Sequence, residues 1–164
     1  DDTTTNTLYI QGNGGVIANY NSSDLFYNFS KLTKIENVNL LDTSNVTDMS
    51  HMFQSCIKLT NLDLSSFDTS QVTNMGEMFS GSTRLTILDV SNFDTSNVTN
   101  MSYMFKNCSK LTSLDFRKAT FDKVTNYSSM FSSVPSTINI ITKDATTKSW
   151  LEDKLGGKGT VTIA

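Results

Sequence analysis

The sequence predicts an α/β repeat fold, a solenoid of about four to five 26-residue coils, each with a short strand and a short helix. The first observation behind this is a near-copy: residues 85–110 match residues 59–84 at more than half of their positions. The second is a constant step of 26 between equivalent apolar residues, which are Val46, Val72, Val98 and Val124, Met52, Met78, Met104 and Met130, and Phe53, Phe79, Phe105 and Phe131. A fixed period of this size is typical of stacked supersecondary units.

Each repeat contains two hydrophobic periodicities. Leu88 and Val90 alternate with Asp89, which predicts a short strand with one buried face. Apolar residues at i, i+3, i+6, i+7 and i+10 then predict a helix of about three turns; they are Val98, Met101, Met104, Phe105 and Cys108. Because a single coil cannot bury this stripe alone, the coils must stack.

Polar residues also recur in register. Asp-Thr-Ser occurs at residues 68–70 and 94–96, where these side chains bond nearby backbone N–H groups and fix a corner. A second polar set can satisfy backbone groups from coil to coil; it comprises Asp48, Asn74, Asn100 and Asn126, each preceded by a threonine. We interpret both sets as scaffold, with contact to a ligand as the alternative.

The first part of the chain predicts a linker and an N-terminal cap. Residues 1–6 are polar throughout and predict a disordered linker. Within residues 7–31, segments 7–11 and 16–19 flank a Gly-Asn-rich turn and predict two short strands or a first coil with a tight corner. Residues 24–32 match the later repeats with a step of 27, as expected of a degenerate coil at a solenoid end.

The clear repeats occupy residues 32–136. Residues 32–42 are one residue longer than their counterpart 59–68, which predicts a β-bulge near residues 37–39. The last copy has drifted in sequence but keeps the phase of the repeat, and Pro135, the only proline, closes it.

Residues 137–164 leave the repeat and predict a C-terminal cap. The isoleucines at 138–141 continue the stack as a strand. Asp144 is suited to cap a helix that runs to about Leu155, where two glycines end it. Residues 160–163 predict a last strand, so the segment reads as a β–α–β lid over apolar surface and strand edges that an open end would expose.

The two cysteines are expected to be free. Cys56 and Cys108 lie two periods apart, and coils stacked at about 4.8 Å per strand would place their Cα atoms about 9–10 Å apart. A disulfide needs less than about 7 Å. We therefore expect two buried thiols that act as small core residues, with a redox or metal pair as the alternative.

Composition and charge argue against several classes of function. With 13 basic and 16 acidic residues the net charge is −3, so we expect no nucleic-acid partner. No apolar run reaches the roughly 18 residues of a membrane span, so we expect no membrane insertion by this fragment. His51, the only histidine, lies off the apolar stripe and is expected to face solvent. Without a partner acid or an oxyanion site we expect no enzyme and no cofactor.

The outward strand positions form the candidate binding face, because repeat solenoids bind partners on a concave strand face. Three in-phase aspartates would form an acidic ladder, but their neighbours supply too few oxygens for calcium, so no metal is expected and a bound cation is the alternative. A mildly acidic face with one apolar point suits a basic protein patch or a polar glycan, in weak or multivalent contact. The candidate residues are Glu36, Asn61, Asp63, Ile87, Asp89, Ser113 and Asp115.

The repeat has the pattern L-x-x-L-D-x-S-x-F-D-T-S-x-V-T-N-M-x-x-M-F-x-x-C, best matched by residues 59–83 and 85–109 and in part by 32–57 and 111–132. This pattern resembles the BspA-like leucine-rich repeats, the bacterial surface protein 26-residue repeat family, over about two-thirds of the chain. The resemblance implies a curved leucine-rich-repeat solenoid on secreted or wall-attached bacterial proteins that contact host or matrix, and it brings no catalytic motif.

The resemblance leads us to expect a monomeric, non-enzymatic adhesion or interaction module. It would lie outside the cell, at the bacterial surface or cell wall, and bind a protein or glycan. The alternative is a structural spacer or assembly subunit of a cell-envelope complex that binds no host ligand.

Overall fold

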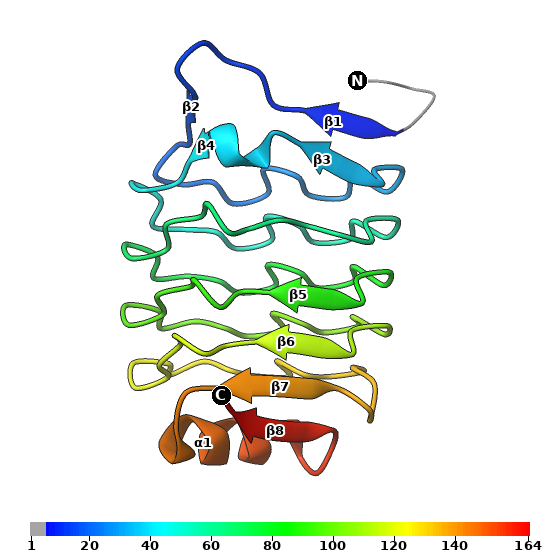
Figure 1. Ribbon diagram of the computed structural model, residues 1–164, viewed down its shortest axis with the longest axis vertical. Helices are drawn as coiled ribbons and strands as arrows, with labels where there is room; N and C mark the ends of the chain where they lie inside the picture. Colours follow the sequence, from blue (N-terminus) through cyan, green and yellow to red (C-terminus); the bar gives the residue numbers. More distant parts are fainter. Residues whose placement is uncertain (1–5) are drawn as a thin grey trace.

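The coils of the chain stack into a solenoid in the computed structural model, which describes residues 6–164 (Figure 1). The linker predicted at residues 1–6 lies, except for Asn6, outside the described residues. The elements are β1 (Thr7–Tyr9), β2 (Val16–Ile17), β3 (Lys34–Glu36), the 3-10 helix η1 (Val38–Leu40), β4 (Leu41–Asp42), β5 (Ile87–Asp89), β6 (Ser113–Asp115), β7 (Asn139–Thr142), α1 (Ala145–Leu155) and β8 (Thr160–Ile163).

One long side of the stack, called the strand side, carries most of the strands and faces the viewer in Figure 1. Strands β5, β6, β7 and β8 pair in parallel, with Leu88, Leu114, Ile140 and Val161 in register and buried. Near the N-terminus, β1 pairs with β3 and β2 with β4, also in parallel. The register of Leu114 with Ile140 confirms that the last strand before the helix continues the repeat.

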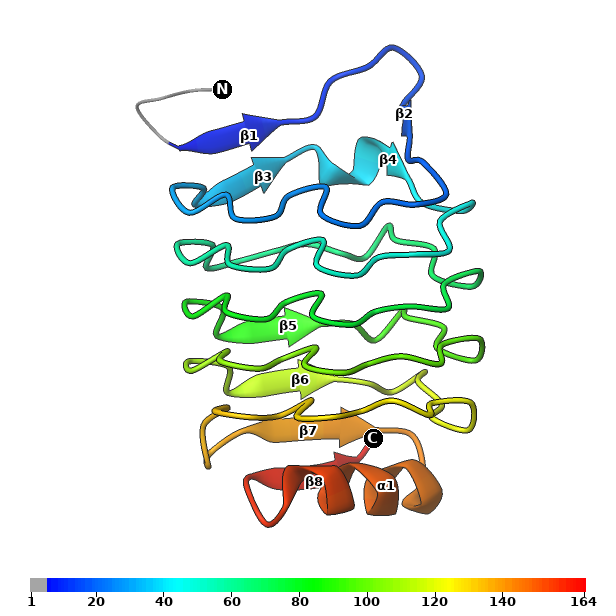
Figure 2. The same ribbon diagram turned by 180° about the vertical axis from the view of Figure 1, so that it is seen from behind.

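The opposite side, called the turn side, comprises residues 21–28, 47–55, 73–81, 99–107 and 125–133 (Figure 2). The predicted helix in each coil is wrong, because these segments are turns. Isolated parallel bridges join them from coil to coil through one polar position, which is occupied by Asn21, Asp48, Asn74, Asn100 and Asn126.

Two features of the backbone exclude a helix on the turn side. Alternate N–H groups bond to a carbonyl of the next coil and not within their own, as when Tyr103 donates to the Ser128 carbonyl at 2.8 Å. Tyr103 and Asn107 also have φ of 57° and 60°, whereas an α-helix needs about −63°. The apolar stripe is nonetheless buried, because the turns point the same residues inward: Val98, Met101, Met104, Phe105 and Cys108 are 0% exposed.

A column of phenylalanine rings runs through the core. Neighbouring rings lie 5.1 to 5.7 Å apart, centroid to centroid, and within 13° of parallel; the column is Phe26, Phe53, Phe79, Phe105 and Phe131. The stacking is one consequence of a strict period, because identical side chains at one phase must meet in adjacent coils.

The two cysteines are free and buried, as predicted. Cys56 lies close to the Phe26 carbonyl, with Sγ 3.2 Å from the oxygen, and Cys108 lies 3.1 Å from the Phe79 carbonyl. The equivalent Ser82 hydroxyl donates to the Phe53 carbonyl at 2.7 Å. The position therefore supplies each coil with a small buried donor to a backbone carbonyl.

The recurring polar residues hold neighbouring coils together, in agreement with their interpretation as scaffold. The buried Thr69 hydroxyl donates to the Asp94 carbonyl of the next coil at 3.0 Å. On the turn side Asn100 donates through Nδ2 to Asn74 Oδ1 at 2.8 Å, and that same oxygen accepts from the Gly76 N–H. Such contacts satisfy buried backbone groups that would otherwise be costly to bury.

The C-terminal helix begins and ends where its capping residues predict. Asp144 accepts from the Thr147 N–H at 2.8 Å, and Gly156 ends α1 with a left-handed φ of 60°. The β-bulge predicted near residues 37–39 is wrong: the extra residue enters η1, which follows Asn37 at φ 59°. Within residues 6–164, no helix is long and apolar enough to cross a membrane.

Candidate functional site

The seven candidate residues lie on the strand side of the stack. Parallel register places Ile87 beside Ser113 and Asp89 beside Asp115. The four central residues are exposed and the other three are half-buried; the exposed ones are Asn61, Asp63, Ile87 and Asp89, and the half-buried ones are Glu36, Ser113 and Asp115. Ile87, the one apolar residue among the seven, is 64% exposed.

The strand ladder is broken where Asn61 and Asp63 lie. Residues 60–64 occupy the strand position of their coil but belong to no strand in the described part of the chain. No backbone hydrogen bond joins residues 60–63 to the coil on either side of them. The N–H and C=O groups of this short stretch, in the middle of the strand side, are therefore not used in a strand ladder.

Two hollows flank this unpaired stretch. One, of about 670 Å³, lies between it and the segment 33–39 that contains β3. The other, of about 330 Å³, lies on the C-terminal side and includes Ile87, Asp89 and Asn92. In place of strand pairing, Asn92 donates through Nδ2 to the carbonyls of Leu64 and Phe67, at 3.0 and 2.9 Å. Asn92 thus keeps the two coils in register while the strands themselves stay apart.

The break lies directly after the coil with the extra residue. Inserting η1 between β3 and β4 lengthens that coil relative to its neighbours. Because parallel strands must run side by side to pair, the longer path of this coil can separate β3 from residues 60–63. The step of 27 was the one sequence signal at this place, and it does not by itself reveal an unpaired strand.

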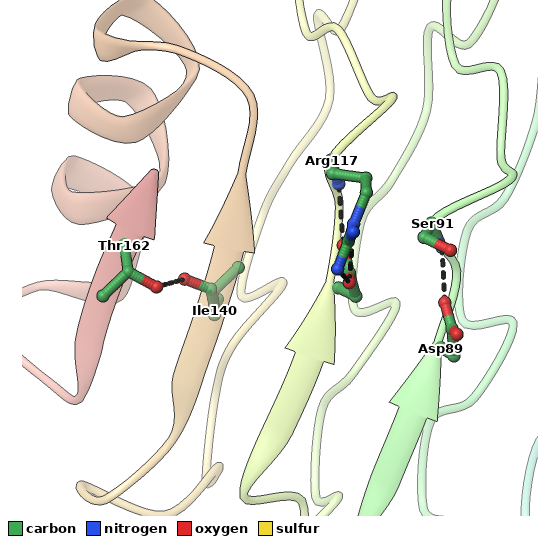
Figure 3. Close-up of polar contacts among 6 residues, drawn as sticks. Asp89, Ser91, Arg117, Ile140 and Thr162 are labelled. Atoms are coloured by element: carbon green, nitrogen blue, oxygen red, sulfur yellow. Dashed lines mark hydrogen bonds and ion pairs between the residues drawn. The ribbon is translucent and has the colours of Figure 1, made fainter. Parts of the chain in front are cut away.

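The aspartates of the predicted acidic ladder are engaged in their own turns. Asp63 accepts from the Ser65 N–H at 3.0 Å. In the same way, Asp89 accepts from the Ser91 N–H at 2.9 Å (Figure 3). Hydrogen bonds from the hydroxyl and backbone of the serine hold the pKa of each carboxyl below its ordinary value. These carboxylates are ionised at neutral pH and fix the corner after the strand.

The third aspartate is paired with a cation. Asp115 accepts from the backbone N–H of Arg117 at 3.0 Å and also from its guanidinium, with Nε 2.9 Å from Oδ2 (Figure 3). Arg117 stands where the other copies have Ser65 and Ser91. The C-terminal end of the strand side is therefore less acidic than the count of aspartates predicted.

Few groups in the part of the chain that the structure describes are suited to bind a metal or to act in catalysis. No three His, Cys, Asp or Glu side chains gather there as a potential ligand set. Burial raises the pKa of the Cys56 and Cys108 thiols to about 11 and about 12. Both cysteines are thus thiols at neutral pH, which disfavours the thiolate that metal binding or nucleophilic attack requires.

The expected place of His51 needs correction. Its side chain is half-buried, with Nδ1 2.7 Å from Gln54 Oε1, and Gln54 donates in turn to Glu77 Oε2 at 2.7 Å. The position is also constrained, because His51 and its counterparts Glu77, Tyr103 and Ser129 have φ of 58°, 57°, 57° and 53°. The side chain at this position differs from coil to coil, but the backbone has the same left-handed conformation in all four coils.

A family model described as "Mycoplasma protein of unknown function, DUF285" matches residues 21–143. No curated protein and no solved structure matches the chain. The family match covers the repeats and β7, and it carries no statement of activity or partner. It does not test the resemblance to BspA-like leucine-rich repeats, which stays a prediction.

Proposed function

The chain belongs to the DUF285 family of proteins of unknown function, and we propose that it is a non-enzymatic bacterial surface module that binds a protein or glycan through its strand side. The observation that carries this proposal is the unpaired stretch 60–63 between two hollows. Elsewhere on this side, the inner strands β6 and β7 are hydrogen-bonded on both edges, whereas residues 60–63 pair on neither.

The chemistry of the site suits a polar partner with one apolar contact. Asn61 offers an amide and Asp63 a carboxylate, and Ile87 projects beside them. Hydroxyl groups of a glycan, or peptide groups and a basic side chain of a protein, can bond to these residues and to the free backbone groups. Because each hollow offers only a few polar side chains, we propose weak contact that gains strength from several copies.

We interpret the coils as BspA-like leucine-rich repeats in which a hydrogen-bonded turn side takes the place of a helix. On this interpretation β7, α1 and β8 form a lid that covers the last coil. The module would be monomeric and would lie outside the cell, at the bacterial surface or cell wall.

The alternative proposal is a structural spacer or assembly subunit of a cell-envelope complex without a host ligand. It is favoured by the aspartates, since Asp63, Asp89 and Asp115 each close a turn of the scaffold. A chain whose recurring aspartates all stabilise turns of its own coils is suited to hold other domains apart.

A screen of matrix proteins, envelope proteins and glycans with wild type and two variants tests the proposal. Ile87→Asp places a charge in the hollow on the C-terminal side of the unpaired stretch, whereas Gln71→Asp adds the same charge at an exposed corner and serves as control. We expect Ile87→Asp to weaken binding at least about tenfold, equivalent to about 1.4 kcal/mol, and Gln71→Asp to leave it unchanged. Equal binding by both variants would exclude the strand side, and binding to envelope proteins alone would favour the spacer.

A further inference from the structure

The turn side has a direction that the strand side lacks. In its inner coils, the alternate N–H groups from Met101 to Asn107 and their equivalents donate toward the C-terminal end of the stack, whereas the threonine that opens each segment donates the other way. From residues 99–107, the donors Tyr103 and Phe105 reach the carbonyls of Ser128 and Met130 at 2.8 and 3.0 Å. Each acceptor lies 25 residues after its donor, and the same rule holds in the preceding coils. The aligned peptide groups place the positive ends of their dipoles toward the C-terminal end.

The last coil of the turn side leaves this row of donors without acceptors. By register the donors are the backbone N–H groups of Tyr127, Ser129, Phe131 and Ser133, and none of them has a hydrogen-bond acceptor within residues 6–164. Their acceptors would come from residues 152 and beyond, but that part of the chain forms the end of α1 and the turn after it. The carbonyls of Asp153 and Leu155 accept from the N–H groups of Gly156 and Lys158 in the turn that ends the helix. Helix α1 lies below the row in Figure 2 and bonds to none of its donors.

A hollow of about 520 Å³ lies between this row and the helix. Tyr127, Ser129 and Phe131 line it on one side, and Lys154 and Lys158 line it on the other. Ser128 and Ser132 also line it and contribute hydroxyl groups. The hollow is therefore rich in donors and lies at the positive end of the aligned peptide groups.

The two lysines differ in their freedom. Lys154 is held by Asp153 at 2.5 Å and lies 4.1 Å from the ring centroid of Tyr127, so it fastens α1 to the last coil. Lys158 has no ion-pair partner in the described part of the chain. The ammonium group of Lys158 is thus available to an anionic group that enters the hollow.

We infer that this hollow binds an acidic peptide segment, which adds to the turn side as the next rung. The carbonyls of the segment accept from the row of N–H groups, as peptide carbonyls do in every inner coil, and a carboxylate of the segment pairs with Lys158. A peptide matches this row better than a single phosphate does, because the donors recur at every second residue along the chain and not around one point. The site is separate from the strand side and does not depend on the function proposed for it.

Amide NMR tests the inference directly. The probes are an N-acetylated, C-amidated octapeptide that alternates Asp and Ser, its counterpart with Lys in place of Asp, and inorganic phosphate. We expect the acidic peptide to shift the amide protons of Tyr127, Ser129 and Phe131 and to slow their exchange with solvent. The amides of Tyr103 and Phe105, which are already bonded, should stay unchanged.

Two variants separate a direct role of the lysine from a general effect of charge. Lys158→Gln should weaken the acidic peptide at least about tenfold, whereas Lys118→Gln, the same change on an exposed corner, should not; circular dichroism checks that both are folded. Unmoved amides at 127–131, or equal affinity of Lys158→Gln and wild type, would overturn the inference. Phosphate that produces the same shifts at the same affinity as the peptide would overturn it too, by showing a small-anion site.

Discussion

Removing one ring from the phenylalanine column tests how the stack is stabilised. Phe79 is fully buried between Phe53 and Phe105, at 5.7 Å from each and within 6° of parallel. Phe79→Ala loses the transfer free energy of the ring and leaves a cavity, which together cost about 3–5 kcal/mol. Each stacked pair is worth about 0.5–1.5 kcal/mol beyond the buried area. Phe131, at the end of the column, stacks on Phe105 alone.

The structure therefore predicts that Phe79→Ala costs more than Phe131→Ala, by about 0.5–1.5 kcal/mol for the second stacked neighbour. Urea unfolding followed by circular dichroism measures both, with midpoints compared at constant slope. Gln71→Ala, at an exposed corner, is the control and should change stability by no more than about 0.5 kcal/mol. A cost below about 1 kcal/mol for Phe79→Ala, or equal costs for both phenylalanines, would refute the idea that inter-coil ring contacts stabilise the stack.

Three further predictions concern a buried threonine, the two thiols and an aspartate at the corner after a strand. Thr69→Val leaves the Asp94 carbonyl without its donor and should lower the free energy of unfolding by about 1–3 kcal/mol in urea. Burial raises the pKa of Cys56 to about 11 and of Cys108 to about 12. The contribution of the two protonated thiols to the free energy of unfolding should therefore be complete below about pH 9 and fall as the pH rises through those values. Urea midpoints that stay constant between pH 9 and 12 would contradict this. Hydrogen bonds from Ser91 lower the pKa of Asp89. The contribution of its carboxylate to the free energy of unfolding is therefore present above the ordinary carboxyl range and is lost as the pH falls through the lowered value. Asp89→Asn should thus make the urea midpoint less sensitive to acid.

Features with a local cause were predictable from the sequence. The bounds of α1 follow from a capping aspartate and a terminal glycine, which act within a few residues of the helix. The free thiols follow from a period of 26, because two residues at one phase and two coils apart are too distant for a disulfide. The burial of Met104 and its neighbours follows in the same way from apolar spacing.

The candidate site was predictable only in part. Alternation along a strand indicated that the side chains of Ile87 and Asp89 point outward, and the structure places both on one exposed side. The break in the ladder at residues 60–63 depends on how one longer coil sits beside a shorter one. The ion pair of Arg117 with Asp115 depends on the turn that brings the two side chains together.

By itself the sequence determined the period, the inward residues and the end of the repeat, because each is written in spacing and in side-chain chemistry. Tertiary structure alone decided the conformation of the turn side. An apolar stripe with helical spacing is equally well buried by turns when the backbone N–H groups find acceptors in the next coil, and no pattern within one repeat reveals that choice. The same dependence on a neighbouring coil leaves the N–H groups of Tyr127, Ser129 and Phe131 unused, because a helix follows them in place of another coil and none of its carbonyls accepts from them.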